Sequence, residues 1–262
     1  MTPIALAVLA TAALLAGCAA PRGPDADARA AAPAPDAVAP FSAMKSLDAG
    51  PWAAWRFHPT KPPTSFRSVS VDGTRVIEAF ADHSVSGLRQ AVDIDPQARP
   101  IIEWRWRIDA PLVGADVSDR HADDAPVRVV LAFDGDTSTL PIKDQLFFER
   151  AKLLTGQDMP YATLMYVWCN KNAAESVVPN PHTSRVRKIV VQSGERGAKQ
   201  WLSYRRDIVA DFERAYGHKP GRLVAVGVMS DSDNTRQVSR AWYGDIRLLE
   251  RARIAQPAPR TE

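Results

Sequence analysis

Five consecutive residues, from Glu103 to Arg107, alternate between charged and aromatic side chains. Successive side chains of a strand point to opposite faces, so Trp104 and Trp106 share one face and the charged residues share the other. With the tryptophans in a core, Glu103, Arg105 and Arg107 line the outer face of a sheet. Planar guanidinium groups suit the carboxylate, phosphate or hydroxyl groups of a ligand. The pattern therefore predicts a recognition surface on that outer face.

Three more residues are predicted to join this surface. Arg128 belongs to a second alternating segment and is expected to present its guanidinium group on the same face. Tyr166 and Trp168 are two residues apart on one strand, so they share a face and form a flat platform for stacking against a sugar. The alternative is that carboxylates such as Glu103 and Asp123 pair with the arginines, and that both aromatic side chains belong to the core.

Two adjacent carboxylates, Asp123 and Asp124, could instead supply the acid or base of a hydrolase, with Asp231 or Asp245 as its partner. Glycoside hydrolases need two carboxyl groups roughly 5 to 10 Å apart across the bond they cleave. Neighbouring residues of an extended chain point to opposite sides, so Asp123 and Asp124 cannot both face one substrate without a bend. Ion pairs with nearby arginines are the other role open to them, and we predict no catalytic residue.

Oxygen-bearing side chains follow one another closely at Asp231, Asp233 and Asn234, as in loops that bind calcium. The segment is not an EF-hand, because Arg236 stands where that loop needs glycine and Trp242 where it needs a bidentate glutamate. The alternative is that these side chains cap the backbone of their own turn. We favour the turn and predict no cofactor and no metal, with calcium as the alternative.

Composition and missing motifs exclude several classes of protein. The chain has 262 residues, of which 45% are hydrophobic, which is enough for one large domain with a buried core. A formal net charge of +3 without a long basic run leaves no footprint for nucleic acid. Two cysteines, Cys18 and Cys169, cannot form a disulfide framework or a Cys-rich zinc site. The motifs of phosphate-binding loops, dinucleotide-binding folds, serine-hydrolase elbows and zinc proteases are missing from the sequence.

Alternation with a period of two dominates the chain between Phe41 and Arg251. It predicts strands at 65–71, 75–80, 88–94, 102–106, 127–133, 164–168 and 242–248. In the last of these, Trp242 is predicted to face the core and Tyr243 to face away. Short continuous apolar runs predict strands buried on both faces at 189–191 and 223–229. Asp72 and Gly73 predict a tight hairpin between the first two strands.

Two segments have helical spacing instead. The first has Pro141 near its start, Gly156 beyond its end, and an apolar stripe at Ile142, Leu146, Phe147, Leu153 and Leu154. The second has Asp207 as N-cap, Gly217 as its stop, and a stripe at Ile208, Phe212, Ala215 and Tyr216. Many short strands with two inserted helices predict a mainly β protein, a two-sheet β-sandwich or jelly roll.

The N-terminal residues are typical of a targeting signal. Residues 1–17 form an uncharged apolar segment typical of a signal peptide, although no Lys or Arg opens it. The four residues that end at Cys18, LAGC, resemble the lipobox of bacterial lipoproteins. That resemblance implies cleavage before Cys18, acylation of its thiol and a membrane as partner. Ala19 at the next position implies the outer membrane. A buried N-terminal helix is the alternative.

The rest of the chain divides by composition. Residues 18–40 combine the lipidated cysteine with an Ala- and Pro-rich stretch that lacks aromatic residues, which predicts a flexible linker. Residues 41–251 contain all the tryptophans and are expected to form a single β-sandwich domain. Residues 252–262 are expected to be a disordered tail.

Several motifs of the folded region carry a resemblance to a known family. They include EWRWR at 103–107, DDAPVRV at 123–129, YVW at 166–168, DSDNT at 231–235 and YGDI at 243–246. With these motifs the chain resembles the bacterial domain of unknown function 3047 family, from about residue 52 to 249. The resemblance implies an exported or envelope protein, a β-sandwich related in shape to carbohydrate-binding modules, and no established activity or catalytic residue.

Three functions remain open at this point. The one we favour is a lipid-anchored, non-catalytic envelope module that holds a glycan or other polar ligand on the arginine and aromatic face. A polysaccharide or cell-wall hydrolase with a carboxylate pair is the first alternative. An envelope protein with a purely structural role is the second.

Overall fold

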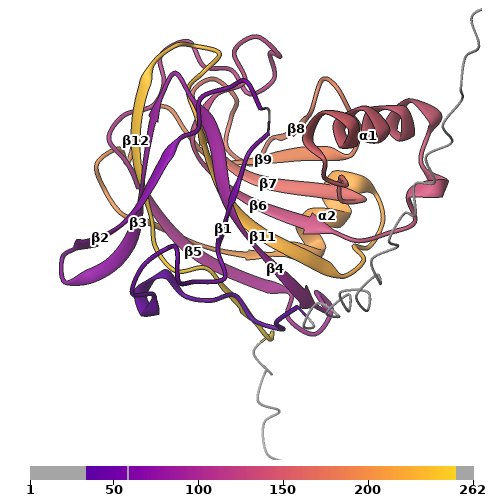
Figure 1. Ribbon diagram of the computed structural model, residues 1–262, viewed down its shortest axis with the longest axis horizontal. Helices are drawn as coiled ribbons and strands as arrows, with labels where there is room; N and C mark the ends of the chain where they lie inside the picture. The colour runs from indigo at the N-terminus through magenta and orange to yellow at the C-terminus, as the bar shows by residue number, and fades with distance from the viewer. Residues whose placement is uncertain (1–33, 58, 252–262) are drawn as a thin grey trace, which may run out of the picture. The chain divides into compact units, whose positions relative to one another are not determined.

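The structure, a computed structural model, describes residues 34–57 and 59–251 and shows two β-sheets packed face to face (Figure 1). Sheet A has seven strands in the spatial order β1 (Ala53–Trp55), β4 (Val85–Ile94), β11 (Leu223–Asp231), β6 (Ala125–Phe133), β7 (Ala162–Cys169), β9 (Val186–Ser193) and β8 (Val177–Pro179). Sheet B has six, in the order β10 (Leu202–Asp207), β5 (Ile101–Ile108), β12 (Val238–Tyr243), β3 (Thr74–Asp82) and β2 (Ser65–Val71), with β13 (Arg247–Leu249) also paired to β5.

This arrangement confirms the mainly β, two-sheet sandwich with two inserted helices, α1 (Ile142–Thr155) and α2 (Ile208–Tyr216). Every predicted strand is present, but 242–248 is divided into β12 and β13. Three strands escape the sequence pattern. β1 and β8 have only three residues each, which is too short for alternation to show, and β10 ends in two arginines and an aspartate.

The hairpin between β2 and β3 forms where Asp72 and Gly73 predict it. Both residues have positive φ, +51° and +73°, as a two-residue turn with the favoured twist requires. Val71 pairs directly with Thr74 across the turn. The turn therefore fixes the register of these two strands in sheet B.

Large aromatic side chains fill the space between the sheets. Trp104 and Trp106 of β5 are 3% and 0% exposed, and Tyr166 and Trp168 meet them from β7 of sheet A. The rings of Trp104 and Tyr166 are stacked with their centroids 4.8 Å apart. The inward direction predicted for both tryptophans of β5 is confirmed, so the residues between them must face outward.

Both helices begin and end where the sequence predicts. α1 follows Pro141 and stops at Gly156, whose φ of +70° closes the last turn. At the start of α2 the Asp207 carboxylate accepts hydrogen bonds from two backbone N–H groups of the first turn. Gly217, with a φ of +79°, ends that helix.

The apolar stripe of α1 does not face the core, which corrects the sequence interpretation. Three of its side chains are 75%, 64% and 86% exposed, namely Ile142, Leu146 and Leu153. The buried side of the helix carries Phe148 and Asp144. The Asp144 carboxylate accepts hydrogen bonds from the hydroxyl groups of Thr183 and Ser184. This polar anchor holds α1 with its opposite, apolar side turned outward.

The folded unit begins earlier than Phe41. The Ala39 N–H donates to Gln90 Oε1 at 2.8 Å, and Gln90 Nε2 donates to the Ala37 carbonyl at 3.0 Å. The last residues of the predicted linker therefore pack along β4. The signal peptide, Cys18, linker residues 18–33 and the tail 252–262 lie outside the described residues. Among the residues that the structure describes, no helix is long and apolar enough to cross a membrane.

Candidate functional site

The outer face of sheet B carries the charged residues of β5. Because Trp104 and Trp106 point into the core, Glu103, Arg105 and Arg107 lie on the opposite face and are half-buried. The structure thus brings together the three residues that the alternation of this strand predicts.

Each of the two arginines lies on a tryptophan ring. The guanidinium carbon of Arg105 is 4.7 Å from the ring centroid of Trp201, and that of Arg107 is 4.8 Å from that of Trp242. Within residues 34–57 and 59–251, neither side chain makes an ion pair or hydrogen bond, and Arg107 Nε is buried without a partner. Stacking fixes the plane of a guanidinium group and leaves its N–H edge available to a ligand.

The position of Trp242 corrects the predicted direction of its strand. Trp242 lies opposite Arg107 in the register of β12 and β5, and it is half-buried on the outer face. Tyr243 points inward instead, where its hydroxyl donates to the Met229 carbonyl at 2.7 Å. Continuous alternation from 242 to 248 assigned the wrong face because β12 ends at Tyr243 and Gly244 follows.

An open groove of about 610 Å³ borders Arg105. Glu103, which lines it, pairs with Arg205 of β10. On the other side, the Asp245 carboxylate accepts hydrogen bonds from the N–H and hydroxyl of Ser42, at 2.8 and 2.7 Å. The carboxylates of Glu103 and Asp245 at the edges of the groove are therefore engaged by partners. The guanidinium group of Arg105 beside them has no such partner among the described residues.

Tyr166 and Trp168 do not line a ligand surface. Both side chains are 0% exposed and belong to the core between the sheets. The Tyr166 hydroxyl donates to Asp211 Oδ2 at 2.9 Å, and Trp168 Nε1 donates to the Gly194 carbonyl at 2.9 Å. The predicted stacking platform is wrong, because the shared face of these residues is the inner one. The aromatic residues beside the β5 arginines are instead Trp201 and Trp242, which are half-buried.

Arg128 lies on sheet A and not beside the β5 arginines. Its side chain is 2% exposed. Its guanidinium group donates to Asp231 through Nε (3.1 Å) and Nη2 (2.9 Å), and to Asp123 through Nη2 (3.0 Å). Lys188, also buried, donates to Asp123 from the other side. The prediction that Arg128 joins the outer face of sheet B is therefore wrong.

The four candidate catalytic acids are all engaged. Burial by itself would raise the pKa of Asp123, but Arg128 and Lys188 hold it below its usual value. Asp124 accepts hydrogen bonds from the N–H and hydroxyl of Thr235, at 2.6 and 2.7 Å. Burial raises the pKa of Asp231 to about 7, with neighbouring carboxylates adding to the effect against the pull of Arg128. With Asp245 held by Ser42 on sheet B, these carboxylates serve mainly to hold the structure together.

Three of these acidic side chains approach one another closely. Carboxylate oxygens of Asp124, Asp231 and Asp233 lie within 4.8 Å of one another. Protein cations already occupy two of them, because Asp231 binds Arg128 and Asp233 binds Lys61. Asn234 uses its backbone N–H and side-chain amide as donors to Asp124 and Asp123. The turn-capping interpretation is therefore corrected: the backbone N–H groups of Asn234 and Thr235 are capped by Asp124 from another segment, whereas Asp231 and Asp233 bind cations.

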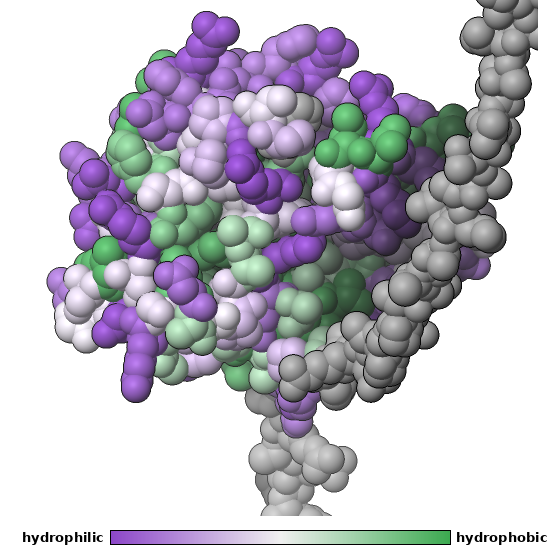
Figure 2. Space-filling model, viewed as in Figure 1, coloured by the Kyte–Doolittle hydropathy of each residue, from purple (hydrophilic) through white to green (hydrophobic). Residues whose placement is uncertain are grey.

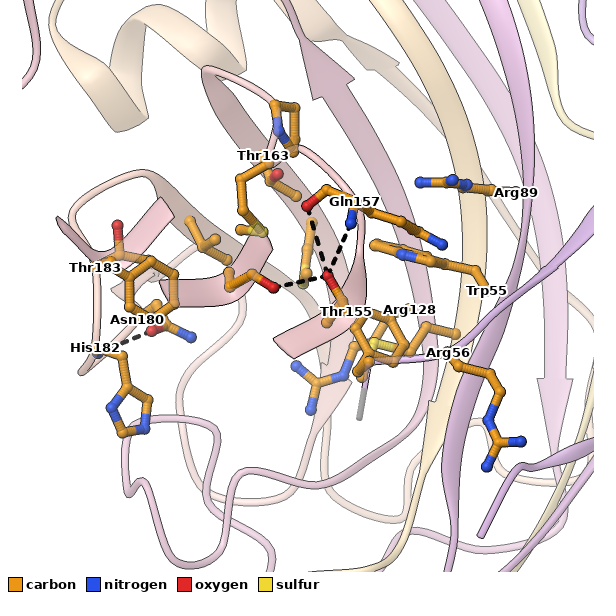
Figure 3. Close-up of a pocket in the computed structure, with 18 of the residues that line it drawn as sticks. Trp55, Arg56, Arg89, Arg128, Thr155, Gln157, Thr163, Asn180, His182 and Thr183 are labelled. Carbon is orange, nitrogen blue, oxygen red and sulfur yellow. Dashed lines mark hydrogen bonds between the residues drawn. The ribbon is translucent and has the colours of Figure 1, made fainter. Parts of the chain in front are cut away.

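A second hollow lies on the outer face of sheet A, and three of the residues singled out in the sequence, Asp123, Arg128 and Asp231, line it. It has a volume of about 300 Å³ and is bounded by Trp55 and Phe57, by Phe147 of α1, and by Arg128 and Met165 of the sheet (Figure 3). Sequence signals for it exist in retrospect: Met165 and Val167 make the outer face of β7 as apolar as its inner face.

The two sheets and the two helices together define a β-sandwich with two helices added. A family match over residues 50–247 shows that the chain belongs to the family described as "Protein of unknown function (DUF3047)". This covers most of the folded unit and includes every residue of the β5 face. No curated protein matches the chain significantly.

Solved structures with similar folds include three that concern carbohydrates. The glycoside hydrolase domain of Endo-D from Streptococcus pneumoniae R6 is 7% identical, with 76% of this chain and 21% of that chain covered and a TM-score of 0.32. The tandem CBM22 domains of Paenibacillus barcinonensis Xyn10C are 11% identical, with 88% of this chain and 50% of that chain covered and a TM-score of 0.33. The mannan-recognising module TmCBM27 is 10% identical, with 82% of this chain and 95% of that chain covered and a TM-score of 0.30.

The chain thus spans about a fifth of the first of these structures and half of the second. At such identities and TM-scores the likeness concerns the general sandwich shape. It assigns no ligand to this chain.

Proposed function

We propose that the protein is a non-catalytic binding module of the cell envelope that holds an acidic glycan on the outer face of sheet B. The observation that carries the proposal is a pair of half-buried arginines without acidic partners among the described residues, Arg105 on Trp201 and Arg107 on Trp242. A partly exposed cation without such a partner is available to an anion from outside.

The spacing of the two arginines supports an extended ligand. Residues two apart on a strand are about 7 Å apart, and both guanidinium planes are fixed by their indole rings. Each N–H edge can donate two parallel hydrogen bonds to one carboxylate. A polysaccharide with acidic groups along its length can reach both arginines, and its sugar rings can stack on exposed parts of the tryptophans.

Hydrolysis has less support from the geometry. A general acid and a base must each reach the substrate with the right protonation state. Here Asp123 is held by two cations, and Asp124 by a backbone N–H and a hydroxyl. Asp231, whose raised pKa would suit an acid, is 3% exposed and bound to Arg128. We therefore favour ligand binding over hydrolysis.

Glycan binding is tested by affinity electrophoresis of the full-length chain in gels that contain polygalacturonate. We expect retardation of the wild type and its loss in R105Q/R107Q, with less than about 1 kcal/mol lost from the free energy of unfolding for each stacked pair. The matched control is R99Q/R222Q, which removes the same charge from two exposed ion pairs with Asp36 and Asp93. If R105Q/R107Q were retarded as strongly as the wild type, the proposed binding face would be wrong.

Lipid anchoring at Cys18 is part of the same proposal and rests on the LAGC motif and the linker composition. Metabolic labelling with radioactive palmitate tests it directly. Because the chain has two cysteines, the control is simple: C169S should keep the label and C18S should lose it. Label in C18S would place the acyl group elsewhere and reject the lipobox.

A further inference from the structure

The outer face of sheet A is apolar, although the sheet has its core on the other side. Alternate residues that point outward, including Val130, Met165, Val167, Val186 and Met229, belong to a second cluster of buried hydrophobic side chains. A sheet face that meets water is normally polar. This face therefore requires a cover, and Trp55 and Phe57 supply part of it.

The cover is incomplete. The hollow of about 300 Å³ beside α1 adjoins another of about 380 Å³, because Trp55, Arg89, Met159 and Thr163 line both. The floor of the second hollow consists of small residues from three strands, namely Ala91, Val130, Ala132, Ala225 and Gly227. Both volumes lie in the range of small-molecule sites, roughly 300 to 1,000 Å³. We call the two together the sheet A trough.

Glycines of the sheet make room for the wall of this trough. A Cβ atom at Gly87 would lie 3.4 Å from the Trp55 ring, and one at Gly227 would lie 3.7 Å from it. The indole thus packs closely over β4 and β11, and side chains there would push it outward. Small residues beneath a large aromatic ring keep an apolar groove open along the sheet.

Two cations that line the trough, Arg56 and Arg89, have no acidic partner among the described residues. Arg56 donates instead to the carbonyls of Pro59 and Lys61. Arg89 makes no ion pair with any residue that the structure describes, and its guanidinium carbon is 5.9 Å from the Trp55 ring centroid. Figure 3 shows its side chain beside Trp55 and facing the region of Gln157. The deeper cations, Arg128 and Lys188, are already bound to carboxylates. Asp158 also lines both hollows, but its carboxylate pairs with Lys152 at 2.8 Å. An anionic group is therefore complementary to the rim beside Arg89, and an apolar group to the floor.

Helix α1 extends the apolar surface to the outside. Phe57, Phe147 and Ala151 line both the first hollow and a more open one of about 640 Å³, which Leu146 and Leu154 also border. Two cations, Lys143 and Arg150, stand beside those leucines. Figure 2 shows hydrophobic side chains gathered on the surface over α1.

We infer that the sheet A trough binds an amphiphile, whose hydrocarbon chain lies along the floor of small residues and whose anionic headgroup lies beside Arg89. This site is independent of the glycan face, because the two use opposite sides of the sandwich. Burial of each methylene group contributes about 0.8 kcal/mol, so a chain of ordinary length gains enough to bind in an apolar groove.

Calorimetric titration of the full-length chain with dodecanoate, below its micelle concentration, tests the site. We expect saturable binding at one molecule per chain. R89Q should lower the affinity for dodecanoate about tenfold and leave that for the uncharged dodecanol unchanged. Lack of saturable dodecanoate binding by the wild type would overturn the proposal.

Filling the trough provides the second test. Ala132 and Ala225 are paired neighbours on its floor, so A132L/A225L should lower the affinity for both dodecanoate and dodecanol more than tenfold. Wild-type affinity in this variant would overturn the site. Thermal melting checks that the variant is folded, and A225M is the milder replacement if it is not.

The glycan-face variant separates this proposal from the previous one. R105Q/R107Q should bind dodecanoate as the wild type does, and R89Q should be retarded by polygalacturonate as the wild type is. A loss of dodecanoate binding in R105Q/R107Q would assign the binding to sheet B and reject the trough.

Two sources of the amphiphile are distinguished with vesicles of dioleoylphosphatidylglycerol. Phospholipid found by mass spectrometry on re-isolated wild type, and not on L146S/L153S, assigns the ligand to a membrane and entry to α1. Uptake of dodecanoate without phospholipid assigns it to free fatty acids.

Discussion

Arginine side chains have opposite environments on the two outer faces of the sandwich. On sheet A, Arg128 is buried and lies between the carboxylates of Asp123 and Asp231. On sheet B, Arg105 and Arg107 are half-buried, have no acidic partner among the described residues, and lie over indole rings. A buried charge is costly unless it is paired, whereas an exposed one keeps part of its hydration. The difference teaches that a guanidinium group marks a binding surface only when its own chain has not already matched its charge.

The largest effect should come from removing the buried cation. R128M leaves Asp123 and Asp231 in the interior without their shared partner, and we expect a loss of about 3–5 kcal/mol in the free energy of unfolding. R107M, which removes an exposed stacked guanidinium, should cost less than about 1 kcal/mol. Urea denaturation of both variants measures the contrast. Equal losses would erase the distinction between the two faces.

The next effect is a pH dependence confined to sheet A. Burial raises the pKa of Asp231 to about 7, from 3.8 in the unfolded chain. Between these values the folded state binds a proton that the unfolded chain has released, so stability falls as the pH rises through this window. We expect a loss on the order of 2 kcal/mol between pH 5 and 7.5. Thermal melting at several pH values should show this slope in the wild type and not in D231N.

Two glycines, Gly87 in sheet A and Gly244 beside Arg105, allow the two faces to be compared by adding a single methyl group to each. A Cβ at Gly87 of sheet A would lie 2.5 Å from the rigid Val228 carbonyl oxygen, so G87A should destabilise by about 1–3 kcal/mol. A Cβ at Gly244 would lie 2.6 Å from the flexible side chain of Arg105. G244A should therefore cost less stability but weaken polygalacturonate retardation, by displacing Arg105 from Trp201. Unchanged retardation would show that the exact position of Arg105 is unimportant.

The smallest effect is expected on α1. Leu153 is 86% exposed, so L153S should change the free energy of unfolding by less than about 0.5 kcal/mol. Chemical denaturation measures it. A loss above 1 kcal/mol would mean that this leucine is covered in solution.

Much of the fold follows from short-range pattern. Trp104 and Trp106 are long apolar side chains at period two, and nothing interrupts β5, so their direction is predictable. The hairpin at Asp72 and Gly73 and the caps at Asp207 and Gly217 are equally local, because a few residues determine them.

Predictions that needed long-range information were wrong. Tyr166 and Trp168 share a face, but only the packing of sheet A on sheet B decides that this face is inside. Arg128 alternates correctly, yet its strand belongs to the other sheet, and strand order is not encoded in alternation. The stripe of α1 was assigned to the core because apolar spacing cannot reveal that Asp144 is the residue that anchors the helix. The trough depends on six strands and a helix, and so has no local signature.

Both margins of sheet A end in strands of three residues, β1 and β8, and β8 closes with Pro179, which has no N–H to donate. Such abbreviated borders offer a neighbouring chain few free backbone groups with which to extend the sheet. Where copies of the domain meet at high concentration, these borders therefore give the sheets little opportunity to join.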